Sequence, residues 1–281
     1  MKSVKYFLLL ASFIYGIISC DVIDEPFTKG DVGQPTLDPN RPNILLEEFT
    51  GHTCIYCPGG SEIAENLHKQ YPDRIFIVAI HAGELAKPQA GEKYNYDFRT
   101  NEGNDIDNFY QASAQGLPRG MVNRIPYNNQ KSYSPGNWIN AIMDFWTKNN
   151  SRQLDIELSA EYDTNAKVIT ANVNLNYFIA QSKQNKLSVW ILEDDIIKGQ
   201  KSNKPPFDIP DYQHNNVLRY SFNGTWGEEI NPVELNFSKN YTLSVSSEKD
   251  WNPNNLRLIA FVYDDDNGVK QVMDTKIKIK E

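Results

Sequence analysis

The residues of this sequence best suited to chemistry are two cysteines, Cys54 and Cys57, with two residues between them. A thiolate is the nucleophile in disulfide exchange, and the positive end of a helix dipole lowers the pKa of a cysteine at the helix N-terminus. Cys54 comes first in the turn, so we expect its sulfur to be exposed and to attack. Cys57 lies further in and would resolve the mixed disulfide. The pair predicts thiol–disulfide exchange.

A strand, a helix and a second strand are expected to hold this pair. Residues 44–49 are mostly apolar and predict a strand before the cysteines. Residues 63–71 carry apolar side chains at helical spacing, and Pro72 ends this helix. Residues 75–80 form an unbroken apolar run, typical of a strand buried on both faces. A Cys-x-x-Cys turn inside such a unit resembles the redox motif of thioredoxin-like proteins.

This resemblance implies a role for a carboxylate. Thioredoxin-like enzymes place a buried Asp or Glu at the end of the first strand, where it exchanges a proton with the inner cysteine, and Glu48 has this position. Glu47 and Glu48 alternate across the strand, so we expect only one of them to face inward. The alternative is that both are ordinary strand-end carboxylates, because buried, unpaired carboxylates are rare.

The resemblance also implies a cis-proline opposite the cysteines. Pro118 fits by its order in the chain, and Leu117 before it would offer backbone groups to a substrate chain. The alternative is a trans proline that starts an edge strand. Tyr56, between the cysteines, joins this predicted substrate-contacting set. With Pro58 it resembles glutaredoxin-like turns, and the direction of electron flow stays open.

His52 precedes the cysteines and has two interpretations. If protonated, it could stabilise the Cys54 thiolate. It could equally be an exposed loop histidine, which is the interpretation that we favour.

The N-terminus predicts export. Residues 1–19 have a charged start and an apolar run, as in a secretory signal peptide. The segment 17–20, Ile-Ile-Ser-Cys, resembles a bacterial lipobox, in which cleavage leaves a lipidated Cys20 as the new N-terminus. The alternative is an ordinary signal peptide with an incidental cysteine. Since the chain has only three cysteines, an oxidising compartment would leave Cys54 and Cys57 joined in a disulfide.

The mature chain divides into a tether and two predicted domains. Residues 20–42 are rich in Pro and Gly and predict a flexible tether. Residues 43–149 form the thioredoxin-like domain, with an insertion at 83–115 and a closing helix after Ser134 and Pro135. Asp105–Ala114 is a candidate helix in the insertion. The insertion's aromatic residues form either a small satellite core, which we favour, or a wall beside the cysteine turn.

Residues 150–281 predict an all-β domain. Strict alternation of apolar and polar residues predicts strands at 154–162 and 169–177. Further strands are expected at 187–192, 217–222, 241–245, 256–263 and 269–279. The sequence Asp266-Asn267-Gly268 predicts the hairpin turn between the last two. This number of short strands favours an immunoglobulin-like β-sandwich. Asp264-Asp265-Asp266 lacks the spacing of a calcium loop and is interpreted as a solvated hairpin tip.

Composition excludes several classes of function. The net charge of −8 and the pI near 5.1 argue against a nucleic-acid partner or a polybasic membrane surface. Two cysteines are half of a tetrahedral zinc site, and no histidine pair has the matching spacing. We expect no metal and no cofactor.

The whole chain is similar to one lipoprotein family. The lipobox, the Phe-Thr-Gly-His-Thr-Cys-Ile-Tyr-Cys-Pro stretch, Asp97–Thr100, the segment 116–124 and the segment 211–219 resemble the family typified by a twenty-eight-kilodalton outer-membrane antigen of anaerobic bacteria. This resemblance implies a thioredoxin-like domain followed by a β-sandwich, lipid-anchored at the outer membrane. It implies no settled activity, and we assign no chemistry to His214–Arg219.

Two hypotheses of function follow. The first is an envelope thiol–disulfide oxidoreductase, whose partners are envelope proteins with thiols or disulfides. The second is a surface binding or adhesion lipoprotein, in which the disulfide is structural and the β-sandwich contacts a partner. A disulfide that closes so short a loop adds little stability, which favours the first hypothesis.

Overall fold

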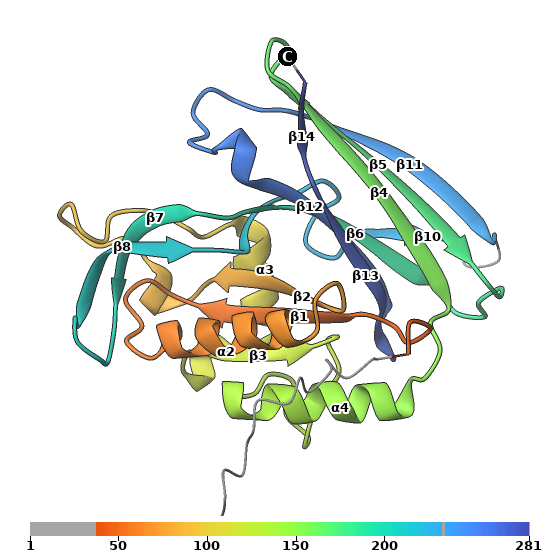
Figure 1. Ribbon diagram of the computed structural model, residues 1–281, viewed down its shortest axis with the longest axis horizontal. Coiled ribbons are helices and arrows are strands. Elements are labelled where there is room, and N and C mark those ends of the chain that lie inside the picture. Colours follow the sequence, from red (N-terminus) through yellow and green to blue (C-terminus); the bar gives the residue numbers. More distant parts are fainter. Residues whose placement is uncertain (1–37, 232–233, 281) are drawn as a thin grey trace, which may run out of the picture. The chain divides into compact units, whose positions relative to one another are not determined.

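The structure is a computed structural model that describes residues 38–231 and 234–280 (Figure 1). The predicted signal peptide, the lipidated Cys20 and most of the predicted tether lie outside the described residues. Among the described residues, no helix is long and apolar enough to cross a membrane.

The predicted strand–helix–strand unit around the cysteines is present. It consists of β1 (Ile44–Thr50), α2 (Cys57–Gln70) and β2 (Ile75–His81). The two strands pair in parallel, from Ile44 with Ile75 to Thr50 with His81, and every residue of both is buried. The helix begins at Cys57 and contains Pro58 in its first turn, where the missing N–H costs no hydrogen bond.

Alternate residues of β1 face two different cores. Ile44 and Leu46 pack with α2 and with α4 (Trp138–Lys148). Leu45 and Phe49 pack on the opposite side, where the core includes α3 (Asn101–Tyr110) and Trp190 of a later strand. Because β1 is covered on both faces, even its polar side chains are buried.

The remaining elements before residue 150 differ in detail from their predictions. The insertion helix α3 begins four residues earlier than predicted, where the hydroxyl of Thr100 accepts a hydrogen bond from the Gly103 N–H. β3 (Arg119–Val122) pairs antiparallel with β1. Ser134 does not cap the closing helix, because a short 3₁₀ turn, Pro135–Asn137, precedes α4.

The strands predicted after residue 150 are present, except that the one expected at 269–279 is divided into two strands of different sheets, and the structure adds more. The strands that follow α4 are β4 (Leu154–Asp163), β5 (Val168–Tyr177), β6 (Asn185–Glu193), β7 (Ile196–Lys201), β8 (Asp208–His214), β9 (Val217–Ser221), β10 (Glu228–Ile230), β11 (Asn236–Ser244), β12 (Leu256–Asp264), β13 (Gly268–Lys276) and β14 (Lys278–Lys280). Of these, β7, β8 and β10 have no counterpart among the predicted strands. β7 and β8 are partly exposed and lack long apolar alternation.

Strands from both predicted domains share one mixed sheet, in the order β13-β12-β6-β9-β2-β1-β3, with β10 paired to β6. The link is a parallel pairing of β2 with β9, between Ala79 and Val217. The predicted boundary at residue 149 therefore marks a change from helices to strands within the chain, while the sheet continues across it. The division into two domains stays a prediction.

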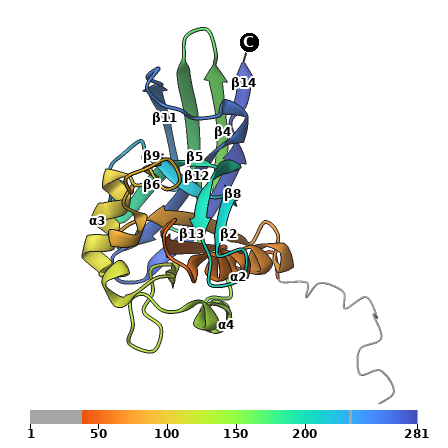
Figure 2. The ribbon, with the colours of Figure 1, turned by 90° about the vertical axis from the view of Figure 1, so that its left-hand side faces the viewer.

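A separate sheet with the order β11-β5-β4-β14 completes the strand-rich part (Figure 2). Its alternating apolar residues share a core with those of β6 and β12, so two sheets enclose this core. Ile156, Val173 and Leu258 are among its members. The alternation that predicted these strands arises because the outer face of the second sheet is exposed.

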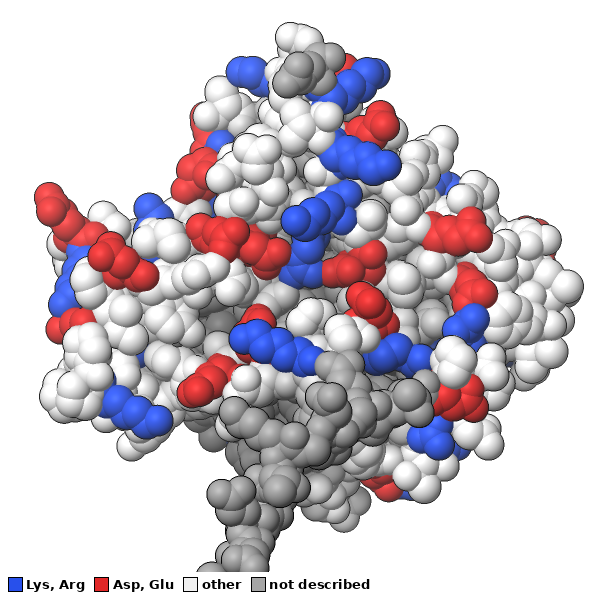
Figure 3. All heavy atoms as spheres, in the orientation of Figure 1, with Lys and Arg blue, Asp and Glu red and all other residues white. Residues whose placement is uncertain are grey.

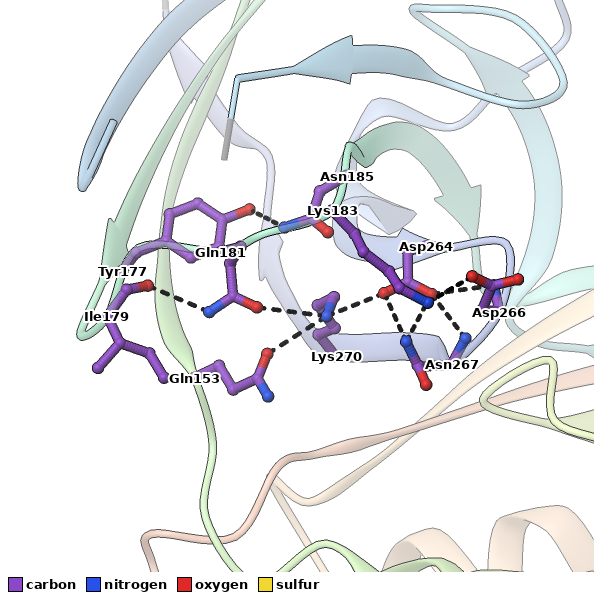
Figure 4. Close-up of polar contacts among 10 residues, drawn as sticks. All are labelled: Gln153, Tyr177, Ile179, Gln181, Lys183, Asn185, Asp264, Asp266, Asn267 and Lys270. Carbon is purple, nitrogen blue, oxygen red and sulfur yellow. Dashed lines mark hydrogen bonds and ion pairs between the residues drawn. The ribbon is translucent and has the colours of Figure 1, made fainter. Parts of the chain in front are cut away.

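The β12–β13 hairpin forms at the predicted turn. Asp264 accepts hydrogen bonds from the backbone N–H groups of Asp266 and Asn267, and Lys270 lies 3.0 Å from its carboxylate (Figure 4). Lys270 also reaches Gln153 and Gln181. The hairpin turn is thus confirmed and Asp265 and Asp266 are exposed, but Asp264 is buried with partners within the hairpin rather than solvated as predicted.

Candidate functional site

Cys54 and Cys57 form a disulfide at the start of α2. Both are buried, with exposed fractions of 2% for Cys54 and 1% for Cys57. The prediction that Cys54 is exposed is wrong for this structure. The reason is that a segment far along the chain, the β7–β8 hairpin, covers the cysteine turn.

The cover is the β7–β8 hairpin and the loop that joins its strands. The Lys201 N–H donates to the His52 carbonyl at 2.9 Å, and the Asn203 N–H donates to the Ile55 carbonyl at 2.8 Å. Gln200, itself buried, donates from its side-chain amide to the Cys54 carbonyl at 2.9 Å. These bonds hold the hairpin against the backbone of the cysteine turn.

Glu48 lies beneath the cysteines on β1, with Ser61 of α2 as its hydrogen-bond donor at 2.9 Å. Burial raises the pKa of Glu48 to about 8, since desolvation penalises the carboxylate more than this one hydrogen bond stabilises it. Glu48 is therefore largely protonated at neutral pH and can donate a proton. Its predicted position is confirmed, while its catalytic role stays a prediction.

Pro118 faces Glu48 across the first turn of α2, and the Leu117–Pro118 peptide bond is cis, as predicted. A Cβ atom on Gly60 would lie 2.7 Å from Pro118 Cγ and 3.3 Å from Glu48 Oε1. Only glycine permits this close approach of helix, proline and carboxylate. Tyr56, in contrast, is 59% exposed beside the turn.

Both glutamates of β1 are buried, so the prediction that only one faces inward is wrong. Glu47 faces the opposite core from Glu48, where it accepts hydrogen bonds from Arg124 Nε at 2.9 Å and Nη2 at 2.7 Å. Arg124 also lies within 5.6 Å of the ring centroids of Trp190, Phe261 and Tyr263. The prediction failed because β1 is a central strand with protein on both faces.

His52 is buried rather than exposed, which overturns the interpretation that we favoured. Its Nε2 lies 3.2 Å from the Tyr94 carbonyl oxygen. Burial lowers the pKa of His52, which disfavours the charged form that would stabilise a thiolate. The structure therefore supports neither predicted role.

Three histidines gather around Phe98. The rings of His81 and His214 each lie 4.4 Å from the Phe98 ring, centroid to centroid, and that of His52 lies 5.6 Å away. The segments Asp97–Thr100 and 211–219 thus meet beside the cysteine turn. Phe98 also packs in a small cluster with Tyr96, Ile196 and Val217, as expected for a satellite core. Phe109 of the same insertion is exposed.

A cavity of about 470 Å³ lies behind Cys57. Its walls include Glu48, His81, Gln200, Tyr212 and His214. Of these five residues, only Glu48 was expected from the sequence to take part in chemistry. The signal for His81 was its position at the end of an apolar strand, but nothing local linked the strands β7 and β8 to the cysteines. In the described part of the chain, no group of His, Cys, Asp and Glu is arranged to hold a metal ion.

Acidic and basic side chains are interspersed on the face drawn in Figure 3. This mixture accompanies the net charge of −8.

Comparison with known proteins identifies similar solved structures and one matching family. HBP35 of Porphyromonas gingivalis is 19% identical over 84% of this chain and 76% of its own, with a TM-score of 0.62, which shows a shared fold. A domain of the outer membrane lipoprotein Omp28 from the same organism is 25% identical over 46% of this chain and 92% of its own, with a TM-score of 0.33. The search of curated proteins found no match. The pattern of the family described as "Outer membrane protein Omp28" matches residues 104–281, more than half of the sequence. The chain therefore belongs to the Omp28 family of outer membrane proteins.

Proposed function

We propose that this protein is a thiol–disulfide oxidoreductase of the bacterial envelope that acts through Cys54 and Cys57. The observation that supports this most is the convergence of four features at one point. The disulfide, the buried Glu48 with its raised pKa, Pro118 and Gly60, whose missing side chain lets them meet, all lie around the first turn of α2. A purely structural disulfide needs none of the other three.

The same features support a thioredoxin-like identity for residues 43–149. The cysteines lie between the first strand of a parallel pair and the body of the helix that connects the pair. An antiparallel strand follows Pro118. In this proposal residues 150–281 form an immunoglobulin-like sandwich attached to the redox unit. The β7–β8 hairpin connects the two, because it belongs to the second segment and covers the first.

The chemistry is thiol–disulfide exchange. A partner thiolate attacks the Cys54 sulfur, a new disulfide forms to the partner, and the bond between Cys54 and Cys57 breaks. The Cys57 sulfur leaves with the bonding electron pair and takes the proton of Glu48. A second partner thiol, deprotonated in turn, displaces Cys54 and leaves the partner oxidised. The reverse sequence oxidises this protein.

The proposed partners are envelope proteins with thiols or disulfides. Once the β7–β8 hairpin opens, the partner chain would contact Leu117, Pro118 and the exposed Tyr56. Lipidation of Cys20 would tether the protein to the membrane.

The reduction potential of the Cys54–Cys57 couple tests this function. Protein that starts near residue 21 is equilibrated against a thiol buffer, and the oxidised fraction is measured. A potential between about −120 and −270 mV with rapid exchange would match working redox proteins. A potential below about −300 mV, or exchange too slow to equilibrate, would show a structural disulfide and overturn the proposal.

Replacement of Cys54 by Ser gives the matched control. Cys57 would then be the only cysteine after residue 20. We expect the Cys54→Ser protein to neither reduce nor oxidise a test disulfide. Retained exchange would show that the chemistry lies elsewhere.

A second function has one observation in its favour. Both cysteines are buried under the hairpin, as expected of a disulfide that only shapes a turn. The protein would then be a surface binding or adhesion lipoprotein whose β-sandwich contacts a partner. Slow exchange in wild-type protein, together with partner capture that survives Cys54→Ser, would favour this alternative.

A further inference from the structure

The cavity behind Cys57 is lined mainly by residues of four elements, β1, β2, α2 and β8. Glu48 and Thr50 of β1 lie on one face of the strand, and their register partners on β2 are Ala79 and His81. Alternate residues of a strand share a face, so these four side chains form one side of the cavity.

The other walls come from α2 and β8. Cys57, Ser61 and Glu65 stand at intervals of four residues along α2, which places them on one side of the helix. Tyr212 and His214 alternate along β8 in the same way. The cavity therefore connects the inner cysteine and the buried carboxyl group with two histidines.

These histidines carry buried nitrogens without partners. His81 is 3% exposed, and among the described residues neither of its ring nitrogens has a hydrogen-bond partner. His214 is 5% exposed, and its Nε2 also lacks a partner in the described part of the chain. Buried polar atoms are rarely unsatisfied, and a polar cavity of this size has room for water molecules that would bond to them.

The proposed exchange reaction requires proton transfer to and from Glu48. When Glu48 protonates the Cys57 sulfur, a carboxylate is left in surroundings that disfavour its charge. With its raised pKa, Glu48 takes up a proton again in the reduced protein, and it must release one before it can accept the proton of Cys57 in the reverse reaction. A neutral imidazole can accept a proton at one nitrogen and release one at the other, so it suits this transfer.

We propose that His81 and His214 are positioning residues that hold water in this cavity and pass protons between Glu48 and the solvent. This inference rests on the proposed exchange function and adds two residues to it. In each reduction of the disulfide, a proton moves from Glu48 to the Cys57 sulfur, and one from solvent crosses the cavity to Glu48. The reverse reaction moves both protons outward.

The surroundings keep both histidines neutral. Burial lowers the pKa of His81 well below its usual value and that of His214 to about 3. His52, Arg219 and His214 face His81 and act in the same direction. The other titratable groups that line the cavity are Glu48, Cys57, Glu62, Glu65, Lys69 and Tyr212.

Substitution of His81 by Phe tests the relay. Phenylalanine keeps a ring that stacks on Phe98 and removes both nitrogens. We expect repeated turnover, in which dithiothreitol reduces the protein and the protein reduces a peptide disulfide, to slow about tenfold, less than full loss of a proton-transfer group would cost. The pH profile of the rate should change shape as well, since proton return then limits turnover.

Chemical rescue separates a relay from a structural effect. His81→Ala enlarges the cavity, and added imidazole should restore much of the lost rate, whereas it should not affect His81→Phe. The matched control is His68→Asn, because His68 lies outside the cavity and uses Nδ1 to contact the Ile75 carbonyl. Asparagine can keep that contact, so the rate should not change.

The outcomes are separable from those of the proposed function. Comparison of the wild-type rate with that of a small reference disulfide tests the function, and the ratio of variant to wild type tests the relay. Unchanged rate and pH profile in a folded His81→Phe protein, or a loss that imidazole does not reverse in folded His81→Ala, would overturn the relay. Far-UV circular dichroism establishes that each variant is folded.

Discussion

At the scale of single residues, burial decides what each ionisable group near the cysteines can do. Glu48 and Glu47 are neighbours in the chain and both are buried, but they meet opposite surroundings. Glu47 meets the guanidinium of Arg124, while Glu48 meets a hydroxyl group and a cavity. Desolvation raises the pKa of Glu48 more than its single neutral hydrogen-bond donor lowers it, and this favours a proton on Glu48.

The raised pKa of Glu48 has a consequence for stability. The folded state holds a proton on Glu48 up to about pH 8, whereas the unfolded chain releases it near its ordinary value of 4.5. Stability should therefore fall as pH rises from about 4.5 to 8, by as much as about 5 kcal/mol at roughly 1.4 kcal/mol per pKa unit. Urea unfolding of oxidised Glu48→Gln protein should show a weaker loss over this range. An identical pH dependence in wild type and variant would contradict the assignment.

Gly60 offers a second test at this scale. A methyl group there would lie 2.7 Å from Pro118 Cγ, so Gly60→Ala should lower the free energy of unfolding by about 1–3 kcal/mol. Gly59 is the matched control, because nothing lies within 4 Å of the position that a methyl group there would take, and alanine favours the helix. Denaturant unfolding of the two variants should thus give opposite signs. Equal stability would show that helix and proline do not pack tightly.

At the scale of elements, the β7–β8 hairpin covers the cysteine turn. It is a two-stranded sheet that pairs with no other strand in the described residues, and hydrogen bonds to the cysteine turn hold its end. Elements with few supporting contacts open more readily than core strands. A partner protein would reach Cys54 after such an opening.

Gln200 is the residue through which this cover can be loosened. Gln200→Ala removes the donor to the Cys54 carbonyl, so the hairpin should open more often. Reduction of the disulfide by a thiol-bearing protein should become several-fold faster at fixed pH, if one such bond contributes about 1 kcal/mol. Ile197→Ala, at an exposed position on the same strand, serves as control. A slower or unchanged reaction would show that the hairpin does not limit access.

At the scale of the whole molecule, a buried ion pair of the first predicted domain packs against aromatic rings of the second. Arg124 pairs with Glu47 of β1 and packs against rings from β6 and β12. The shared sheet makes the same connection through the backbone. The two predicted domains are therefore expected to unfold together.

Removal of one member of this ion pair should strongly lower the free energy of unfolding. Arg124→Leu or Glu47→Leu alone leaves one buried charge without its partner and should lower stability by about 3–5 kcal/mol. The double variant removes both charges and should lose much less than the sum of the single losses. A double-mutant cycle by urea unfolding measures this coupling. Additive losses would mean that the pair contributes no coupling across the core.

Much of this protein could be predicted from local sequence, because local patterns reflect burial. The apolar run at 75–80 indicated a strand covered on both faces, and strict alternation after residue 150 indicated strands with one exposed face. The disulfide between Cys54 and Cys57 was expected because these are the only cysteines after residue 20. The position of Pro118 and its cis bond followed from resemblance to a known motif.

Tertiary structure alone decided the surroundings of these residues. The burial of Cys54 depends on a hairpin nearly 150 residues away, as the separation of Gln200 from Cys54 shows. The cavity needs side chains from β1, β2, α2 and β8, and no local pattern relates these segments to one another. Sequence determines which groups are present and how each segment alternates. Folding determines which groups lose contact with water, and desolvation then sets their charge and reactivity.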